Sequence, residues 1–129
     1  MTDILTPISP GELLDKLTIL TIKLERIEDA EKRANVAVEH AALTAVSDVH
    51  IPKDAEIVRL DAALLAVNKE LWDIEDDIRD CERSGDFGAE FVRLARAVYV
   101  TNDKRAQLKK DINIHLGSAL VEEKSYAAY

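Results

Sequence analysis

The sequence predicts an all-α fold, a helical bundle built on one long antiparallel helical hairpin. The chain has only four Gly and three Pro among 129 residues, and 47% of its residues are apolar, which is typical of a folded helical protein. One stretch has apolar residues at alternating steps of three and four, the seam of a helix packing along another helix. This seam comprises Ile57, Leu60, Leu64, Val67, Leu71, Ile74, Ile78 and Cys81.

The two predicted arms of this hairpin are residues 54–83 and 86–116. Ser84-Gly85 forms the break between them, and Asp86 is the expected N-cap of the second arm. The first arm carries ten acidic and four basic side chains, and the second carries four acidic and six basic. Opposite net charges favour antiparallel pairing of the two arms, in the manner of a coiled coil.

Antiparallel pairing predicts a polar layer midway along the long hairpin. The register places Asn68 opposite Asn102, and Arg105 near Asp61. Two interpretations remain open. The layer either consists of hydrogen-bonded polar groups that fix the register, or it lines a ligand or metal pocket.

A shorter hairpin, residues 10–28 and 30–46, is expected to pack on the long one within a single domain that spans residues 1–129. Ser9-Pro10-Gly11-Glu12 has the pattern of a helix N-terminus with a capping box. The first of these helices has a leucine stripe, and Ile19 and Ile22 lie on its other side. This helix therefore either lies at the centre of the bundle or, as we favour, contacts a second copy of the chain in a homodimer through Ile19 and Ile22.

The second short helix is expected to start after Asp29 and to end near Val46, followed by a linker at residues 47–53. It is rich in alanine, so it buries little apolar area and depends on its neighbours for stability.

Composition narrows the possible functions. The net charge of -8 and the lack of a basic, aromatic-rich stripe argue against a nucleic-acid surface. No signal sequence or membrane-length apolar run is present, so we expect a cytoplasmic protein without a membrane partner. Cys81 is the only cysteine, and the three histidines have no metal-ligand spacing, so we expect no metal site and no cofactor.

Two carboxylate pairs offer an enzymatic alternative. Glu25 and Glu28, and Glu70 and Asp73, each lie one helical turn apart, which suits Mg²⁺ coordination by oxygen. The pairs resemble the ExxE and ExxD elements of an all-α nucleotide pyrophosphohydrolase, and this resemblance implies a Mg²⁺-dependent enzyme. Solvated helix faces with i,i+4 ion pairs explain them equally well.

A further polar set is predicted on the last helix. Tyr99, Asn102 and either Lys109 or Asn113 share much of one face, so they either line a groove for an anionic or sugar-like ligand or satisfy the ends of the two short helices. Together with Asn68 and Arg105 they are the candidate ligand residues. Gly117-Ser118 is expected to end this helix, and residues 119–129 form a tail.

Several separated blocks resemble a family of short bacterial proteins of unknown function. The blocks are SPGELLDKLTIL at residues 9–20, ELWDIED at 70–76, YVTNDKRA at 99–106 and EEKSY at 122–126. The resemblance spans nearly the whole chain and implies a bacterial single-domain protein, but no activity. We therefore expect a non-enzymatic interaction or scaffold module that has a protein partner or forms a homodimer. The Mg²⁺-dependent hydrolase remains the alternative.

Overall fold

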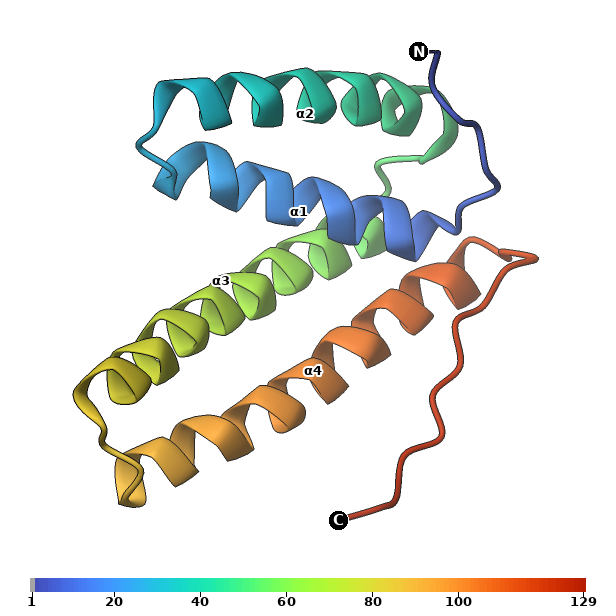
Figure 1. Cartoon of the computed structure of the whole chain (residues 1–129). Helices are drawn as coiled ribbons and strands as arrows, with labels where there is room; N and C mark the ends of the chain where they lie inside the picture. The colour runs from blue at the N-terminus through green and yellow to red at the C-terminus, as the bar shows by residue number, and fades with distance from the viewer. Residues whose placement is uncertain (1) are drawn as a thin grey trace.

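The computed structural model describes residues 2–129, which fold into four α-helices (Figure 1). The described residues contain no β-strand, and none of their helices is long and apolar enough to cross a membrane. The all-α prediction is confirmed. The helices are α1 (Pro10–Arg26), α2 (Ala30–His50), α3 (Ala55–Ser84) and α4 (Ala89–His115).

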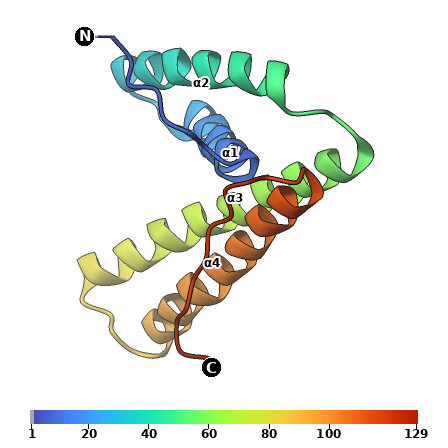
Figure 2. The ribbon, with the colours of Figure 1, turned by 90° about the vertical axis from the view of Figure 1, so that its right-hand side faces the viewer.

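The helices form two antiparallel hairpins, α1–α2 and α3–α4, which contact each other through α1. Helix α1 packs against α2, α3 and α4, whereas α2 packs only on α1 within the described part of the chain. Figures 1 and 2 show α2 on the far side of α1 from the long α3–α4 hairpin. Helix α1 is therefore the element that connects the two hairpins.

The central place of α1 corrects the expected homodimer contact. Ile22 is only 1% exposed, and Ile19 is partly buried, because the α3–α4 hairpin covers this side of the helix. A side chain as buried as Ile22 is part of the core. The second apolar face of α1 thus serves the fold of a single chain.

Apolar side chains form two clusters. The larger one lies where α1 meets the paired ends of the long hairpin, and contains Leu13, Leu14, Ile51, Ile57, Leu60, Leu64 and Ile112. The smaller one lies nearer the hairpin turn and contains Ile74, Cys81 and Leu94. Cys81 is buried and its thiol has a raised pKa because of burial and nearby acidic groups, so it behaves as an apolar core residue.

Most predicted helix boundaries agree with the structure, and two need correction. Helix α4 begins at Ala89 rather than at 86, because the Asp86 carboxylate accepts a hydrogen bond from the Gly88 amide in a turn before the helix. Helix α2 continues to His50, since the chain has no helix breaker before Pro52. Gly85 ends α3 in the left-handed conformation, with a φ of 70°.

The start of α1 lies directly against α4. The Gly11 amide, one of the donors that a helix N-terminus leaves unpaired, donates to Asn113 Oδ1 at 2.7 Å. A Cβ atom at Gly11 would overlap the Lys109 carbonyl oxygen and would lie 2.9 Å from Asn113 Oδ1. This crossing therefore requires a residue without a side chain.

We expect Gly11→Ala to lower the free energy of unfolding by about 1–3 kcal/mol, because the added methyl group has to push α1 away from α4. Urea denaturation followed by circular dichroism measures the change. Gly88→Ala is the comparison, because the nearest atom to a Cβ there is a side-chain oxygen of Asp86 at 3.3 Å rather than backbone, so this variant should cost less than Gly11→Ala. Equal stability of Gly11→Ala and the wild type would contradict the close contact.

Candidate functional site

An ion pair between a buried carboxylate and a partly buried arginine, 29% exposed, joins α1 to α4. Asp15, whose side chain is 1% exposed, accepts two hydrogen bonds from the Arg105 guanidinium: Nε lies 2.8 Å from Oδ1 and Nη2 lies 2.5 Å from Oδ2. This bidentate geometry is the strongest arrangement for an arginine and a carboxylate.

Helix α3 contributes to the same network through Asn68. Its Nδ2 donates to Asp15 Oδ1 at 3.0 Å and to Thr18 Oγ1 at 2.8 Å. The Thr18 hydroxyl donates to the Asp15 carbonyl oxygen at 2.7 Å. The polar layer expected within the long hairpin is thus assembled on α1. The register pointed to Asp61 as the carboxylate near Arg105, but the partner of Arg105 is Asp15.

The pKa of Asp15 reflects opposing influences. Burial raises it, but hydrogen bonds from Arg105 and Asn68 and the positive charges of Arg105 and Lys109 lower it more. The net result is a pKa below the usual range, so the carboxylate is ionised at neutral pH. The charge of Asp15 is therefore compensated inside the fold and is not available to an exogenous ligand.

A second set of ion pairs fixes the C-terminal tail to α4. Lys109 Nζ lies 2.7 Å from carboxylate oxygens of both Glu12 on α1 and Glu122 in the tail. Further along the tail, the Tyr129 hydroxyl donates to Asp103 Oδ2 at 2.6 Å, and its ring packs edge-on against Tyr99. The tail, residues 119–129, runs back along α4 without forming a helix (Figure 2).

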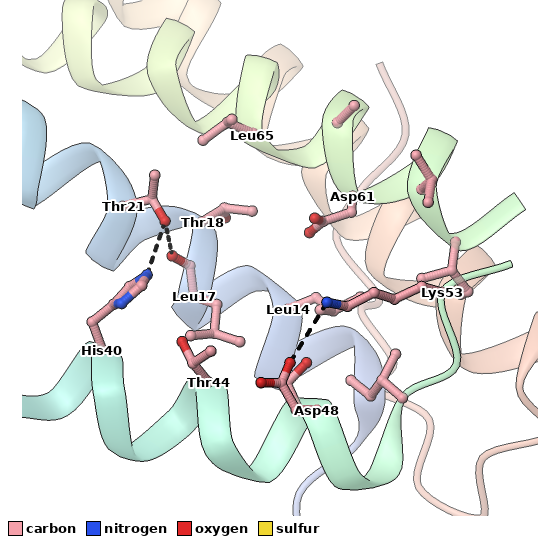
Figure 3. Close-up of a pocket in the computed structure, with 15 residues that line it drawn as sticks. Leu14, Leu17, Thr18, Thr21, His40, Thr44, Asp48, Lys53, Asp61 and Leu65 are labelled. Atoms are coloured by element: carbon pink, nitrogen blue, oxygen red, sulfur yellow. Dashed lines mark hydrogen bonds and ion pairs between the residues drawn. The ribbon is translucent and has the colours of Figure 1, made fainter. Parts of the chain in front are cut away.

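A groove of about 530 Å³ lies beside α1, between the C-terminal half of α2 and the N-terminal half of α3 (Figure 3). Leu14 and Leu17 of α1 and Ile57 and Leu65 of α3 contribute much of its apolar lining. The groove exists because α2 packs on α1 alone and leaves the facing side of α3 uncovered.

Polar groups stand at the edge of this groove. His40 Nε2 on α2 lies 3.3 Å from Thr21 Oγ1 on α1, and Lys53 Nζ lies 3.6 Å from Asp48 Oδ1 (Figure 3). These contacts connect neighbouring elements but leave the centre of the groove open to a partner.

Asp61 is the one carboxylate that enters the groove from α3, and Figure 3 shows its oxygens pointing into the space. Burial raises its pKa, and no ion pair with a cation of residues 2–129 offsets that effect. Asp61 is thus a partly buried carboxylate that forms no ion pair within the described chain, unlike Asp15, because the groove's one lysine, Lys53, lies against Asp48.

The six predicted ligand residues have different roles in the structure, and one of them, Tyr99, is exposed and packs against Tyr129 of the tail. Four of them connect helices through the contacts described above: Asn68, Arg105, Lys109 and Asn113. These contacts are of the kind expected if the polar groups are hydrogen-bonded within the fold. Asn102 makes no side-chain hydrogen bond with the rest of residues 2–129, and it lines a pocket together with Asn68 and Arg105.

The carboxylates of the enzymatic alternative do not form a metal site. Glu25 lies 3.4 Å from Lys69, and Asp73 lies 2.6 Å from Arg26, so both form ion pairs on the surface. Glu28 and Glu70 are exposed. Among the described residues, no three His, Cys, Asp or Glu side chains are placed so that they could hold a metal ion.

Sequence reasoning missed Asp15 and the groove. The only signal for Asp15 is a carboxylate between core leucines at Leu13-Leu14 and Leu17, an unusual position for an acid on an apolar helix face. The groove has no local signal, because His40, Asp48 and Asp61 are brought together only by how α2 and α3 diverge.

These features define a class: an all-α protein of two crossed helical hairpins, joined by a buried ion pair and open to solvent beside its central helix. The model of a family of unknown function, DUF6165, matches residues 4–129, and the chain belongs to this family. No curated protein and no solved structure matches the chain.

We expect Arg105→Ala to lower the free energy of unfolding at pH 7 by about 3 kcal/mol, because it leaves the Asp15 charge buried without a partner. Arg93→Ala, which breaks the exposed pair with Glu90, is the control and should cost about 1 kcal/mol or less.

The effect of Arg105→Ala should also depend on pH. The folded-state pKa of Asp15 lies below the ordinary value of about 3.9, so the ion pair contributes its full stability above that pH and loses it as the pH falls through the folded-state pKa. The difference between the variant and the wild type in urea denaturation should therefore shrink in acid. A difference that is the same at pH 7 and pH 3.5 would show that Asp15 is not the group concerned.

Proposed function

We propose that this protein is a non-enzymatic interaction module whose groove beside α1 binds an amphipathic helix of a partner protein. The observation that carries the proposal is Asp61, a carboxylate turned into a largely apolar groove without an ion pair among the described residues. The one lysine of the lining, Lys53, lies against Asp48 instead. The matching ligand is a helix that presents apolar side chains and one lysine or arginine on the same face.

The shape of the groove supports a helical partner. Its walls are the sides of α1, α2 and α3, and recognition of a helix in a groove between helices relies on apolar side chains at i, i+3, i+4 and i+7. A volume of about 530 Å³ accommodates several such side chains. A bound helix would take the place next to α3 that α2 leaves vacant.

Charge supports a basic partner. The chain carries a net charge of -8, which steers basic partners toward it and disfavours acidic ones. Within the groove, a cation placed next to Asp61 would offset the cost of burying that carboxylate. A neutral partner gains nothing from Asp61, so the carboxylate acts as a specificity element.

A second copy of this chain is the other candidate partner, and would make the protein a homodimer as predicted. Val38 and Val49 on α2 are 73% and 78% exposed and lie eleven residues apart, about three helical turns, on the same side of the helix. The surrounding alanines allow a second helix to approach closely. The dimer would use this outer face of α2, and not the buried Ile22.

A displayed library of helical peptides tests the groove. Peptides selected on the wild-type protein should carry a basic residue among apolar residues at helical spacing, and should bind Asp61→Asn roughly tenfold more weakly. Asp77→Asn, an equal change of charge at an exposed position of α3, should bind them as the wild type does.

Stability separates this role of Asp61 from a structural one. Because burial raises the folded-state pKa of Asp61, its charge destabilises the fold above that pKa, and the cost disappears as the pH falls through it. Asp61→Asn should therefore melt at the same temperature as the wild type or higher, while losing the peptides. Selected peptides without a basic preference, or with unchanged affinity for Asp61→Asn, would contradict the proposal.

Self-association through α2 predicts a dimer of the wild-type chain in sedimentation equilibrium at micromolar to millimolar concentration. Val38→Asp combined with Val49→Asp should yield a monomer with unchanged helix content, because both side chains are exposed in the single chain. Val92→Asp, at an exposed position of α4, is the control and should remain dimeric. A wild-type chain that stays monomeric over this range would remove the second copy as a partner.

A further inference from the structure

A second pocket, of about 490 Å³, lies where α1 crosses the long α3–α4 hairpin. It is distinct from the groove of Figure 3, because its lining comes from Ile19 and Ile22 of α1 together with residues of α3 and α4. Pockets of this size between the helices of a bundle are typical sites for small molecules.

The polar side chains of this pocket have hydrogen-bonding capacity that the fold does not use. Asn68 donates both bonds from Nδ2 to α1, and its Oδ1 has no donor within residues 2–129. Arg105 binds Asp15 through Nε and Nη2, which leaves Nη1 free. The Asn102 amide and the Trp72 indole nitrogen have no hydrogen-bond partner in the described chain.

These unused groups are accessible rather than sealed in the core. No buried side-chain nitrogen or oxygen of the described residues lacks a hydrogen-bond partner, so each unpaired atom is open to solvent. For Asn68, which is itself buried, the accessible space is the pocket that it lines. One acceptor, two donors and one complete amide group thus belong to residues that line the same pocket.

The charges of the pocket favour an uncharged ligand. Arg79 pairs with Glu75 and Arg105 pairs with Asp15, so each positive charge is already neutralised by a carboxylate. Asp76 is the remaining charged group of the lining, and unlike the half-buried Asp61 it is exposed, so water screens its charge and it selects weakly for a ligand of either sign. A phosphate or carboxylate ligand would therefore find no free cation.

We propose that this pocket binds an uncharged sugar ring, a neutral pyranose, which packs one face on Trp72 and the isoleucines and directs its hydroxyl groups to the amides of Asn68 and Asn102. Each hydroxyl both donates and accepts, which matches the mixed set of unused groups. A pyranose also carries hydroxyls around its whole rim, as needed when the polar groups come from both α3 and α4.

A nucleobase fits the pocket less well. Bases are commonly held by stacking on aromatic side chains and by hydrogen bonds along part of their edge. The lining of this pocket contains a single aromatic side chain, Trp72, and its polar groups stand on two different helices. The lining also contains the aliphatic residues Ile19, Ile22 and Leu71, which suit the C–H groups of a sugar ring.

The binding experiment uses Trp72, the only tryptophan of the chain, as its reporter. The ¹⁵N-labelled chain of residues 1–129 is titrated with methyl glucoside, methyl galactoside, methyl mannoside and N-acetylglucosamine, and separately with glucuronate, glucosamine and adenosine. At least one neutral pyranose should produce a saturable shift of the Trp72 indole and Asn102 side-chain signals. Glucuronate and glucosamine should bind at least fivefold more weakly, and adenosine should not compete.

The test variant is Asn102→Ala, which should weaken binding of that sugar about tenfold by removing both a donor and an acceptor. Its melting temperature should match the wild type, because the Asn102 side chain forms no hydrogen bond in the described fold and alanine favours a helix. Asn35→Ala, at an exposed position of α2, is the matched control and should keep full affinity.

Three results would overturn the proposal. The first is the absence of a saturable Trp72 shift with every neutral pyranose up to about 100 mM. The second is tighter binding of a charged sugar or of adenosine. The third is a shift that Asn102→Ala leaves unchanged. None of these results bears on the helix-binding groove, which shares no lining residue with this pocket.

Discussion

The buried pair of Asp15 and Arg105 is the interaction on which the rest of the structure depends. Removing the Asp15 carboxylate from water is costly, and the cost is offset only when the geometry is good and the remaining hydrogen bonds are satisfied; Arg105 keeps 29% of its side chain exposed. The bidentate contact and the donation from Asn68 meet both conditions. Because these groups come from α1, α4 and α3, the pair sets where three helices cross.

The pair contributes specificity of arrangement more clearly than it contributes net stability. Replacement of a buried ion pair by apolar residues is often neutral, whereas loss of one partner is strongly destabilising. A shifted register of α1 on the long hairpin would separate Asp15 from both Arg105 and Asn68. The contact of Gly11 with α4 adds a steric constraint at the N-terminal end of α1, so its position along the hairpin is determined at two places.

The same arrangement accounts for both openings beside α1. Helix α1 packs against three neighbours, α2 packs on α1 alone within the described residues, and the groove between α2 and α3 therefore remains open. On another side of α1, Asn68 and Arg105 use some of their hydrogen-bonding atoms to bind α1. The same two side chains also line the second pocket. Both proposed sites therefore result from the way α1 packs against its three neighbours. They differ in chemistry because a carboxylate, Asp61, lines the first and the amide side chains of Asn68 and Asn102 line the second.

Local sequence determined the helices, because their signals act over a few residues. Ser9, Asp29 and Asp54 cap helices through bonds to amides three residues on, and Gly85 and Gly117 end them in a conformation that few other residues adopt. Only the tertiary structure decided what the polar side chains do. Asp15 meets Arg105 across ninety positions of sequence, and Asp61 faces a groove because α2 and α3 diverge. Contacts of this kind depend on how whole helices cross, which no short pattern of residues encodes.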